Sequence, residues 1–228
     1  MYKRVLAIGD IHGMYNKLVS LMDKIQFDAS NDLLVFLGDY IDRGKQPLKV
    51  LSYVRKLQTD FPKSVVLLKG NHEALMLDYF HTRCYSSRMW LDNGGKVTFN
   101  EFIALSEEER IDWLKWIDSL PLFFQYKNFY FCHAGVYPYA PLKKQREKDL
   151  LWIRHYFFED YAGKETIVVG HTPVQSVSYL WDSSKLRDAD SIEPLFLDNH
   201  IILCDTGAYK SYGKLSCVNV LTKQFWQA

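Results

Sequence analysis

The sequence predicts an α/β fold with a parallel sheet in its N-terminal half and a polar site at the carboxyl ends of the strands. Two observations support this prediction. Short β-rich apolar runs alternate with helix-length amphipathic segments in the first part of the chain, and the runs end next to Asp, His or Asn with a glycine close by. With 228 residues, of which 48% are hydrophobic and 24% charged, the chain can bury a sizeable core, and we expect one domain over residues 1–228.

Strands are expected where apolar and β-branched residues form short runs. These runs are Arg4–Ile8, Leu33–Leu37, Val65–Leu68, Phe129–Cys132, Thr166–Val169 and Ile201–Cys204. Between the first three runs, Met14–Ile25 and Leu48–Leu57 repeat apolar residues at the three- and four-residue spacing of one helix face. The resulting βαβα order favours parallel strands, because a helical crossover returns the chain in the same direction.

The middle of the chain is predicted to be helical over Ala74–Leu120. Within this segment, Ser106 and Glu109 stand three residues apart in the pattern of a capping box, which would begin a helix. The sequence then returns to strands, with a hairpin turn expected at Lys127 and Asn128. We expect the helical segment to lie within the same domain as the strands.

Composition and charge disfavour several classes of function. The 28 Lys+Arg against 27 Asp+Glu give a net charge of +1, so we expect no nucleic-acid partner. No apolar stretch approaches the ~20 residues that a membrane span needs, and no secretion or anchoring signal is visible, so we expect no membrane partner. The cysteines lack metal-binding spacing, which is typical of reduced residues in a cytoplasmic protein: Cys84, Cys132, Cys204 and Cys217.

The polar residues after the strands offer a set of metal ligands, in the sequences GDIHG, GDYIDRG, GNHE, HAG and GHTP. Carboxylates, imidazoles and an amide, without a thiolate, suit Mn, Fe or Zn better than a closed structural zinc. The candidates are Asp10, His12, Asp39, Asn71, His133 and His171. Their number exceeds the needs of one ion. Two ions about 3.5–4 Å apart that share a carboxylate can clamp a phosphoryl group and activate a water to attack phosphorus in line.

Three further residues fit roles that do not require metal binding. His72, next to Asn71, could protonate a leaving oxygen, and Asp42 could orient His72 and keep it protonated. Arg43 could bind phosphate oxygens bidentately, or it could form a structural salt bridge with Asp42. A single Asp-x-His after a strand is often only a turn element, so the indication of an active site comes from the whole set.

The motifs D-x-H-G, G-D-x-x-D-R-G and G-N-H-E together resemble those of the phosphoprotein phosphatase (PPP) family of metallophosphoesterases. The later HAG and GHTP sequences resemble that family's remaining metal-binding histidines. The short chain is similar to the compact bacterial and phage branch of serine/threonine protein phosphatases, and the similarity spans Gly9 to Gly207. The resemblance implies a calcineurin-like metallophosphoesterase fold, in which two mixed β-sheets form a sandwich flanked by helices.

The resemblance also implies a role for each motif residue. Asp39 would bridge two divalent ions, for which Mn is expected and Fe, Zn or Ni are alternatives. His72 would be the general acid with Asp42 behind it, and Arg43 and Arg154 would bind the phosphate. The implied ligands are Asp10, His12 and Asp39 for one ion, and Asp39, Asn71, His133 and His171 for the other.

The favoured function is a protein serine/threonine phosphatase that acts on a phosphorylated protein or a small phosphomonoester. Symmetrical dinucleoside tetraphosphatases share the framework, but their second motif typically lacks the acid before the arginine, whereas this chain has Asp42. The neutral charge balance speaks against a metal-dependent nuclease. A scaffold without activity would be expected to lack ligands or the acid, and all are present. Asp205 and Tyr209 also match a family segment near the site, without an assigned chemistry.

Overall fold

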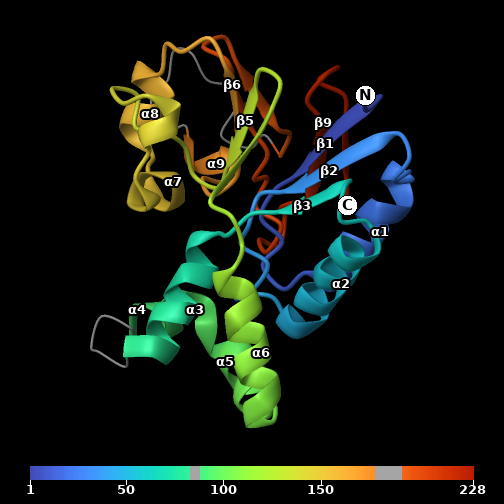
Figure 1. Cartoon of the computed structure of the whole chain (residues 1–228), viewed down its shortest axis with the longest axis vertical. Helices are drawn as coiled ribbons and strands as arrows, with labels where there is room; N and C mark the ends of the chain where they lie inside the picture. Colours follow the sequence, from blue (N-terminus) through green and yellow to red (C-terminus); the bar gives the residue numbers. More distant parts are fainter. Residues whose placement is uncertain (83–87, 178–191) are drawn as a thin grey trace.

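Two five-stranded sheets form the centre of the molecule (Figure 1). The computed structural model describes residues 1–82, 88–177 and 192–228. The first sheet has the strand order β10-β9-β1-β2-β3 and the second has the order β4-β5-β6-β8-β7. The strands are β1 (Arg4–Ile8), β2 (Asp32–Phe36), β3 (Val65–Leu67), β4 (Phe123–Tyr126), β5 (Phe129–Cys132), β6 (Thr166–Val169), β7 (Leu195–Leu197), β8 (Ile201–Leu203), β9 (Ser216–Asn219) and β10 (Phe225–Gln227).

Both sheets mix parallel and antiparallel strands, which confirms the predicted fold class. In the first sheet, β1, β2 and β3 run parallel, while β9 and β10 are antiparallel additions. In the second sheet, β5, β6 and β8 run parallel between the antiparallel edge strands β4 and β7. The parallel strands of each sheet therefore end at a common edge, where the candidate site residues begin.

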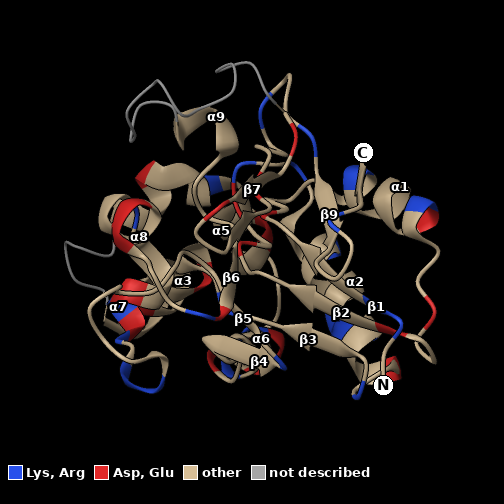
Figure 2. Ribbon diagram, turned by 90° about the horizontal axis from the view of Figure 1, so that it is seen from above, with Lys and Arg blue, Asp and Glu red and all other residues tan. Residues whose placement is uncertain are grey.

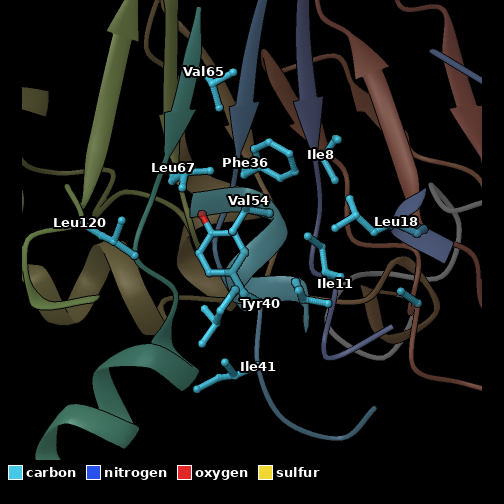
Figure 3. Close-up of a cluster of buried hydrophobic side chains, with 14 of the residues drawn as sticks. Ile8, Ile11, Leu18, Phe36, Tyr40, Ile41, Val54, Val65, Leu67 and Leu120 are labelled. Atoms are coloured by element: carbon cyan, nitrogen blue, oxygen red, sulfur yellow. The ribbon is translucent and has the colours of Figure 1, made fainter. Parts of the chain in front are cut away.

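Side chains that alternate along the strands build three apolar layers. In β1, Val5 and Ala7 belong to a buried cluster that also contains Val168 and Ile202 of the second sheet, so the two sheets pack face to face. The outer face of the first sheet is covered by α1 (Tyr15–Ile25) and α2 (Pro47–Asp60). Figure 3 shows part of that outer cluster, with Tyr40 beside Phe36. The outer face of the second sheet packs against α7 (Glu147–Trp152), α8 (His155–Asp160) and α9 (Val174–Val177).

The predicted helical segment forms a block that extends away from the sheets, at the bottom of Figure 1. Its parts are α3 (Asn71–Thr82), α4 (Arg88–Trp90), the π-helical turn η2 (Leu91–Gly95), α5 (Lys96–Ile103) and α6 (Glu107–Asp118); a short 3-10 turn, η3 (Leu142–Lys144), lies elsewhere. The capping box is confirmed. The backbone N–H of Glu109 donates to Ser106 Oγ (3.3 Å), and the backbone N–H of Ser106 donates to Glu109 Oε2 (2.9 Å).

The predicted strands agree with the observed ones to within a residue, and the hairpin between β4 and β5 is confirmed. Leu37, Leu68 and Cys204 fall just beyond their strands, because the chain leaves the sheet there to enter the site. The sequence did not predict β7, β9 or β10, which have three or four residues each, too few for an alternating pattern. The N-terminal sheet is thus completed by the C-terminal end of the chain.

Other expectations from composition have mixed outcomes. Cys132, Cys204 and Cys217 are free and buried, as predicted, whereas Cys84 lies outside the described residues. In the described part of the chain, no helix has both the length and the apolar character that crossing a membrane requires. Figure 2 shows residues of both charge signs distributed over the helices and loops rather than gathered on one side.

The capping box generates a stability prediction. Ser106→Ala removes the acceptor for a backbone N–H in the first turn of α6, so the free energy of unfolding should fall by about 1 kcal/mol. Ser52→Ala, at an exposed position inside α2, is the matched control and should leave stability unchanged or slightly raised, because alanine is the better helix former. Urea denaturation of both variants checks this, and equal effects would contradict the capping role.

Candidate active site

The six predicted metal ligands lie together at the carboxyl ends of the parallel strands. Asp10 and His12 follow β1, Asp39 follows β2 and Asn71 begins α3 just after β3. From the second sheet, β5 leads directly to His133 and β6 leads to His171. Each of these six side chains belongs to a residue no more than 6% exposed. The structure therefore joins turns that are up to 161 positions apart in the sequence, as the contact between Asp10 and His171 illustrates.

Left-handed backbone conformations are concentrated at this site. Five non-glycine site residues have positive φ angles, namely His12 (46°), Asp39 (53°), Asp42 (71°), Arg43 (65°) and His171 (62°). Such conformations cost about 1–3 kcal/mol each and persist only where the surroundings fix them. Hydrogen bonds between the turns provide that support, because the backbone N–H of His12 donates to the carbonyl of Asp39 (2.9 Å) and that of Gly44 donates to the carbonyl of His12 (3.0 Å).

The Asp39 carboxylate lies at the centre of the cluster. Its Oδ2 is 3.5 Å from His12 Nε2 and 3.9 Å from His72 Nε2, while its Oδ1 is 3.4 Å from His133 Nε2. Two groups with the spacing of a metal site share this carboxylate: His12, Asp39 and His72 in one, and Asp39, His133 and His171 in the other. Asp39 is thus placed as a bridging ligand would be.

The remaining predicted ligands border these two groups. Asn71 Oδ1 is 2.8 Å from His133 Nε2 and 2.9 Å from His171 Nδ1, so the amide oxygen joins the second group. Asp10 Oδ2 is 3.9 Å from His12 Nε2, beside the first group. The first group therefore differs from the predicted ligand set in one respect: it contains His72, whereas Asp10 lies beside it. The assignment of individual ligands stays a prediction.

The imidazole orientations fit a cation between them. His12 Nδ1 lies 2.9 Å from the carbonyl of Ile41, and His133 Nδ1 lies 2.8 Å from the carbonyl of Leu37. Each Nδ1 donates its proton to a carbonyl, so in the neutral ring the Nε2 lone pair faces the oxygens of the cluster. A lone pair facing an oxygen favours a cation between the two. Among the described residues, His171 Nε2 is also buried without a hydrogen-bond partner. The oxygen and nitrogen donors suit divalent metal ions.

Burial sets the protonation states that metal binding requires. It lowers the pKa of His12, His133 and His171, so their rings are neutral near pH 7. Burial would raise the pKa of Asp39, but the nearby histidines outweigh it and hold this pKa below its usual value. Burial, together with Asp205 and Asp39, raises the pKa of Asp10 well above its usual value. This excess of buried negative charge would be relieved by cations.

His72 and Asp42 form a buried pair, as predicted. His72 Nδ1 is 2.6 Å from Asp42 Oδ2, and both residues are no more than 2% exposed. Burial lowers the pKa of His72, but the charges of Asp39 and Asp42 and the hydrogen bond to Asp42 outweigh it, so the net shift is upward. The pair therefore favours a protonated imidazole with Nε2 turned toward the metal-ligand cluster.

Arg43 lies over the cluster rather than against Asp42. Its guanidinium contacts His12 Nε2 and is 3.0 Å from His72 Nε2, and its Cζ is 4.4 Å from the ring centre of Tyr209. The ion pairs of the described residues do not include Arg43 with Asp42. The alternative of a structural salt bridge is thus not what this geometry supports.

Arg154 reaches the site from between α7 and α8, the helices that cover the second sheet. Its Nη1 donates to Thr172 Oγ1 (2.9 Å), next to His171. The Arg154 guanidinium is also close enough to Asp10 and Asp39 for their charges to favour its protonated form. The structure therefore brings both predicted phosphate-binding arginines to the edge of the cluster.

Sequence reasoning missed several residues that support the site. Glu73 is fully buried and accepts hydrogen bonds from the backbone N–H groups of Asp39 (2.8 Å), Tyr40 (2.9 Å), Ile41 (3.3 Å) and Gly70 (2.9 Å). It therefore fixes the turn that presents Asp39. The only sequence signal for Glu73 was its place at the end of the GNHE motif, in which Asn71 and His72 had already been given roles.

Trp90 and Thr98, from the helical block, were also missed. Trp90 Nε1 donates to Asp42 Oδ2 (2.8 Å) and Thr98 Oγ1 donates to Asp42 Oδ1 (2.6 Å). No local pattern marks either residue, because each meets Asp42 only after the block has folded.

The two unassigned residues also lie at the site. Asp205 is buried and accepts a hydrogen bond from the backbone N–H of Gly207 (2.9 Å), and burial raises its pKa to about 6. Tyr209 meets the His12 ring edge to face at 5.2 Å and supports the Arg43 guanidinium. Both therefore contribute to the shape and charge of the site.

Comparisons with known proteins agree with this geometry. Residues 3–204 match the family described as calcineurin-like phosphoesterase. A serine/threonine-protein phosphatase 2 of Escherichia coli (strain K12) is 37% identical over 158 residues, which cover 66% of this chain and 68% of that protein. A symmetrical bis(5'-nucleosyl)-tetraphosphatase of Buchnera aphidicola is 35% identical over 135 residues, which cover 58% of this chain but only 44% of that protein.

A solved structure extends the likeness over the whole chain. It is described provisionally as a diadenosine tetraphosphatase, and it superimposes with a TM-score of 0.70 at 19% identity, covering 100% of this chain and 95% of its own. At that identity the comparison shows a shared fold only.

The role of Glu73 generates a prediction. Glu73→Gln replaces one acceptor oxygen by an NH₂ group, so two of the four backbone N–H groups lose their acceptor and the free energy of unfolding should fall by about 2–4 kcal/mol. Glu101→Gln is the matched control, since Glu101 is only half-buried and accepts one backbone N–H, from Leu48 at 3.2 Å. Urea denaturation of metal-free protein should give a clearly smaller loss for the control; similar losses would contradict the role of Glu73.

Proposed function

Because this chain belongs to the calcineurin-like phosphoesterase family, we propose that it hydrolyses phosphomonoesters and acts as a protein serine/threonine phosphatase. The substrate would be a phosphorylated protein or a small phosphomonoester. Two divalent ions are proposed as cofactors, with Mn as the expected metal and Fe, Zn or Ni as alternatives. We further propose that residues 1–228 act as one domain and that the protein works in the reducing cytoplasm, which the free, buried Cys132, Cys204 and Cys217 support.

The observation that carries the proposal is the buried pair of His72 and Asp42. A phosphomonoester with a poor leaving group, such as a seryl oxygen, needs a proton as the ester bond breaks. Asp42 holds His72 through Nδ1 at 2.6 Å and so turns Nε2 toward the cluster, where it lies 3.0 Å from Arg43 Nη2. When bound, two metal ions would supply an activated water and neutralise charge on the phosphoryl group.

The other site residues are assigned by position. Asp10, His12 and Asp39, with Asn71, His133 and His171, are proposed to hold the ions. Arg43 and Arg154 are proposed to bind phosphoryl oxygens, since a guanidinium matches two oxygens of one phosphate. Glu73 is proposed to keep Asp39 in its left-handed turn.

A second candidate function is hydrolysis of symmetrical dinucleoside tetraphosphates, which the similarity to the Buchnera enzyme favours. A bridging phosphate has two free oxygens and a substituent on either side, whereas the terminal phosphoryl group of a monoester presents three. Two arginines therefore suit the monoester better. Asp42, the acid before the arginine, supports the same choice, and the complete set of ligands and acid speaks against an inactive scaffold.

The general-acid assignment predicts a loss that depends on the leaving group. His72→Asn should lower kcat about 10²–10⁴-fold on a phosphoserine peptide and far less on nitrophenyl phosphate, whose leaving group needs little protonation. Metal content should stay largely intact. His155→Asn, at an exposed position outside the site, is the control and should leave both rates unchanged. Equal losses on both substrates would show that His72 positions or binds instead.

The arginines predict a substrate preference. With Mn, kcat/KM should be higher for nitrophenyl phosphate and phosphopeptides than for diadenosine tetraphosphate, measured side by side on one preparation. Arg43→Ala should raise KM for monoesters, because one phosphate-binding guanidinium is lost. Arg55→Ala, which removes a surface pair with Asp112, should not. A large preference for the dinucleotide would overturn the phosphatase proposal and favour the second candidate.

A further inference from the structure

The turn that carries Asp42 and Arg43 has an unusual backbone. Two successive non-glycine residues have left-handed φ angles, 71° at Asp42 and 65° at Arg43. Such a turn does not hold itself, because each residue would relax to a right-handed or extended conformation without external contacts. Besides the hydrogen bonds from His72 and between the site turns, the turn is held by contacts from the segment formed by residues 90–98, in the helical block.

Four hydrogen bonds join this segment to the turn. Asp42 accepts from Trp90 Nε1 (2.8 Å) and from Thr98 Oγ1 (2.6 Å), and the backbone N–H of Asp42 donates back to Thr98 Oγ1 (2.9 Å). The backbone N–H of Arg43 donates to the carbonyl of Gly94 (3.1 Å). With His72 on Oδ2 as well, the buried Asp42 carboxylate has side-chain donors on both oxygens.

The local structure of the segment is adapted to this close approach. The helical block is kinked at η2, because Asn93 and Gly94 have non-helical backbone angles there. Gly94 has a φ of 101°, and a Cβ there would come within 2.8 Å of Arg43 Cγ. A Cβ on Gly95 would come within 2.6 Å of Trp90 Nε1. A larger residue at Gly94 would therefore crowd Arg43, and one at Gly95 would displace the indole of Trp90.

The indole of Trp90 is itself held by α3. Its ring centre is 5.3 Å from that of Tyr79 and 5.9 Å from that of Phe80, both on α3. The same helix carries His72 in its first turn. The position of both members of the His72–Asp42 pair therefore depends on α3. His72 belongs to that helix, and Asp42 is connected to it through Trp90.

We propose that Trp90 and Thr98 are positioning residues for proton donation: they fix the Asp42 carboxylate so that it holds His72 with Nε2 toward the leaving oxygen. This inference rests on the proposed function, in which His72 is the general acid. It gives the helical block a part in the reaction through the hydrogen bonds of Trp90 and Thr98 to Asp42. The consequence is that removing either donor should affect catalysis only through His72.

The test compares leaving groups. Thr98→Val and Trp90→Phe each remove one hydrogen bond to a buried carboxylate, and each should lower kcat about 10- to 100-fold on a phosphoserine peptide, with a much smaller loss on nitrophenyl phosphate. Thr98→Ser keeps the hydroxyl and should retain most of the peptide activity. Trp113→Phe, a tryptophan substitution in α6 of the same block, should change neither rate selectively.

A double-variant cycle distinguishes positioning from a general structural effect. In the His72→Asn background, adding Thr98→Val should cause little further loss on the peptide, because the residue it acts through is already gone. The proposal is overturned if the losses in kcat from His72→Asn and Thr98→Val multiply in the double variant. It is also overturned if Thr98→Val and Trp90→Phe lower kcat equally on both substrates while metal content and thermal stability are unchanged. If the Thr98→Val protein does not fold, Trp90→Phe and Thr98→Ser still test the proposal. Full peptide activity in Trp90→Phe would contradict the positioning role.

The proposed function has a separate point of failure. If His72→Asn itself shows no dependence on the leaving group, the general-acid assignment is wrong. If His72→Asn shows that dependence and neither Trp90→Phe nor Thr98→Val does, only the positioning inference is wrong.

Discussion

Concentrated buried charge is the constraint on which the rest of this structure depends. Asp10, Asp39, Asp42, Glu73 and Asp205 are all nearly inaccessible to solvent, and they gather where the parallel strands of both sheets end. Each carboxylate is tolerated because something compensates it: backbone N–H groups for Glu73, an imidazole and two side-chain donors for Asp42, and surrounding histidines for Asp39. Metal cations would complete this compensation, which links the stability of the fold to the proposed chemistry.

The two-sheet architecture explains why the site can form at all. The first group, His12, Asp39 and His72, follows strands of the first sheet, whereas the second group adds His133 and His171 of the second sheet to Asp39, so the complete site needs both sheets. The apolar layer between the sheets fixes their relative position, because it interdigitates residues of both. The helical block adds a third source of contacts, through Trp90 and Thr98, to the turn of Asp42 and Arg43.

Much of this arrangement could be predicted from the sequence, for physical reasons. A strand that ends at a glycine leaves an unmistakable local pattern, so Asp10, Asp39 and His171 could be placed at strand ends without coordinates. Glu73, Trp90 and Thr98 could not be assigned in this way, because the turns of Asp39 and Asp42 that they hold are 30 or more positions away and no periodicity records these contacts. Strands β9 and β10 were not predicted because they have only four and three residues, although β9 pairs with β1 from the other end of the chain.

The measurement that tests the central claim most directly is the metal content of Asp39→Asn. Equilibrium dialysis against Mn, followed by elemental analysis, would compare the unmodified protein, Asp39→Asn and the surface control Asp112→Asn. Since the Asp39 carboxylate faces histidines of both groups, the account predicts two ions per chain in the unmodified protein and the control, and weakened binding of both ions together in Asp39→Asn. An Asp39→Asn protein that retains either ion with unchanged affinity would contradict it.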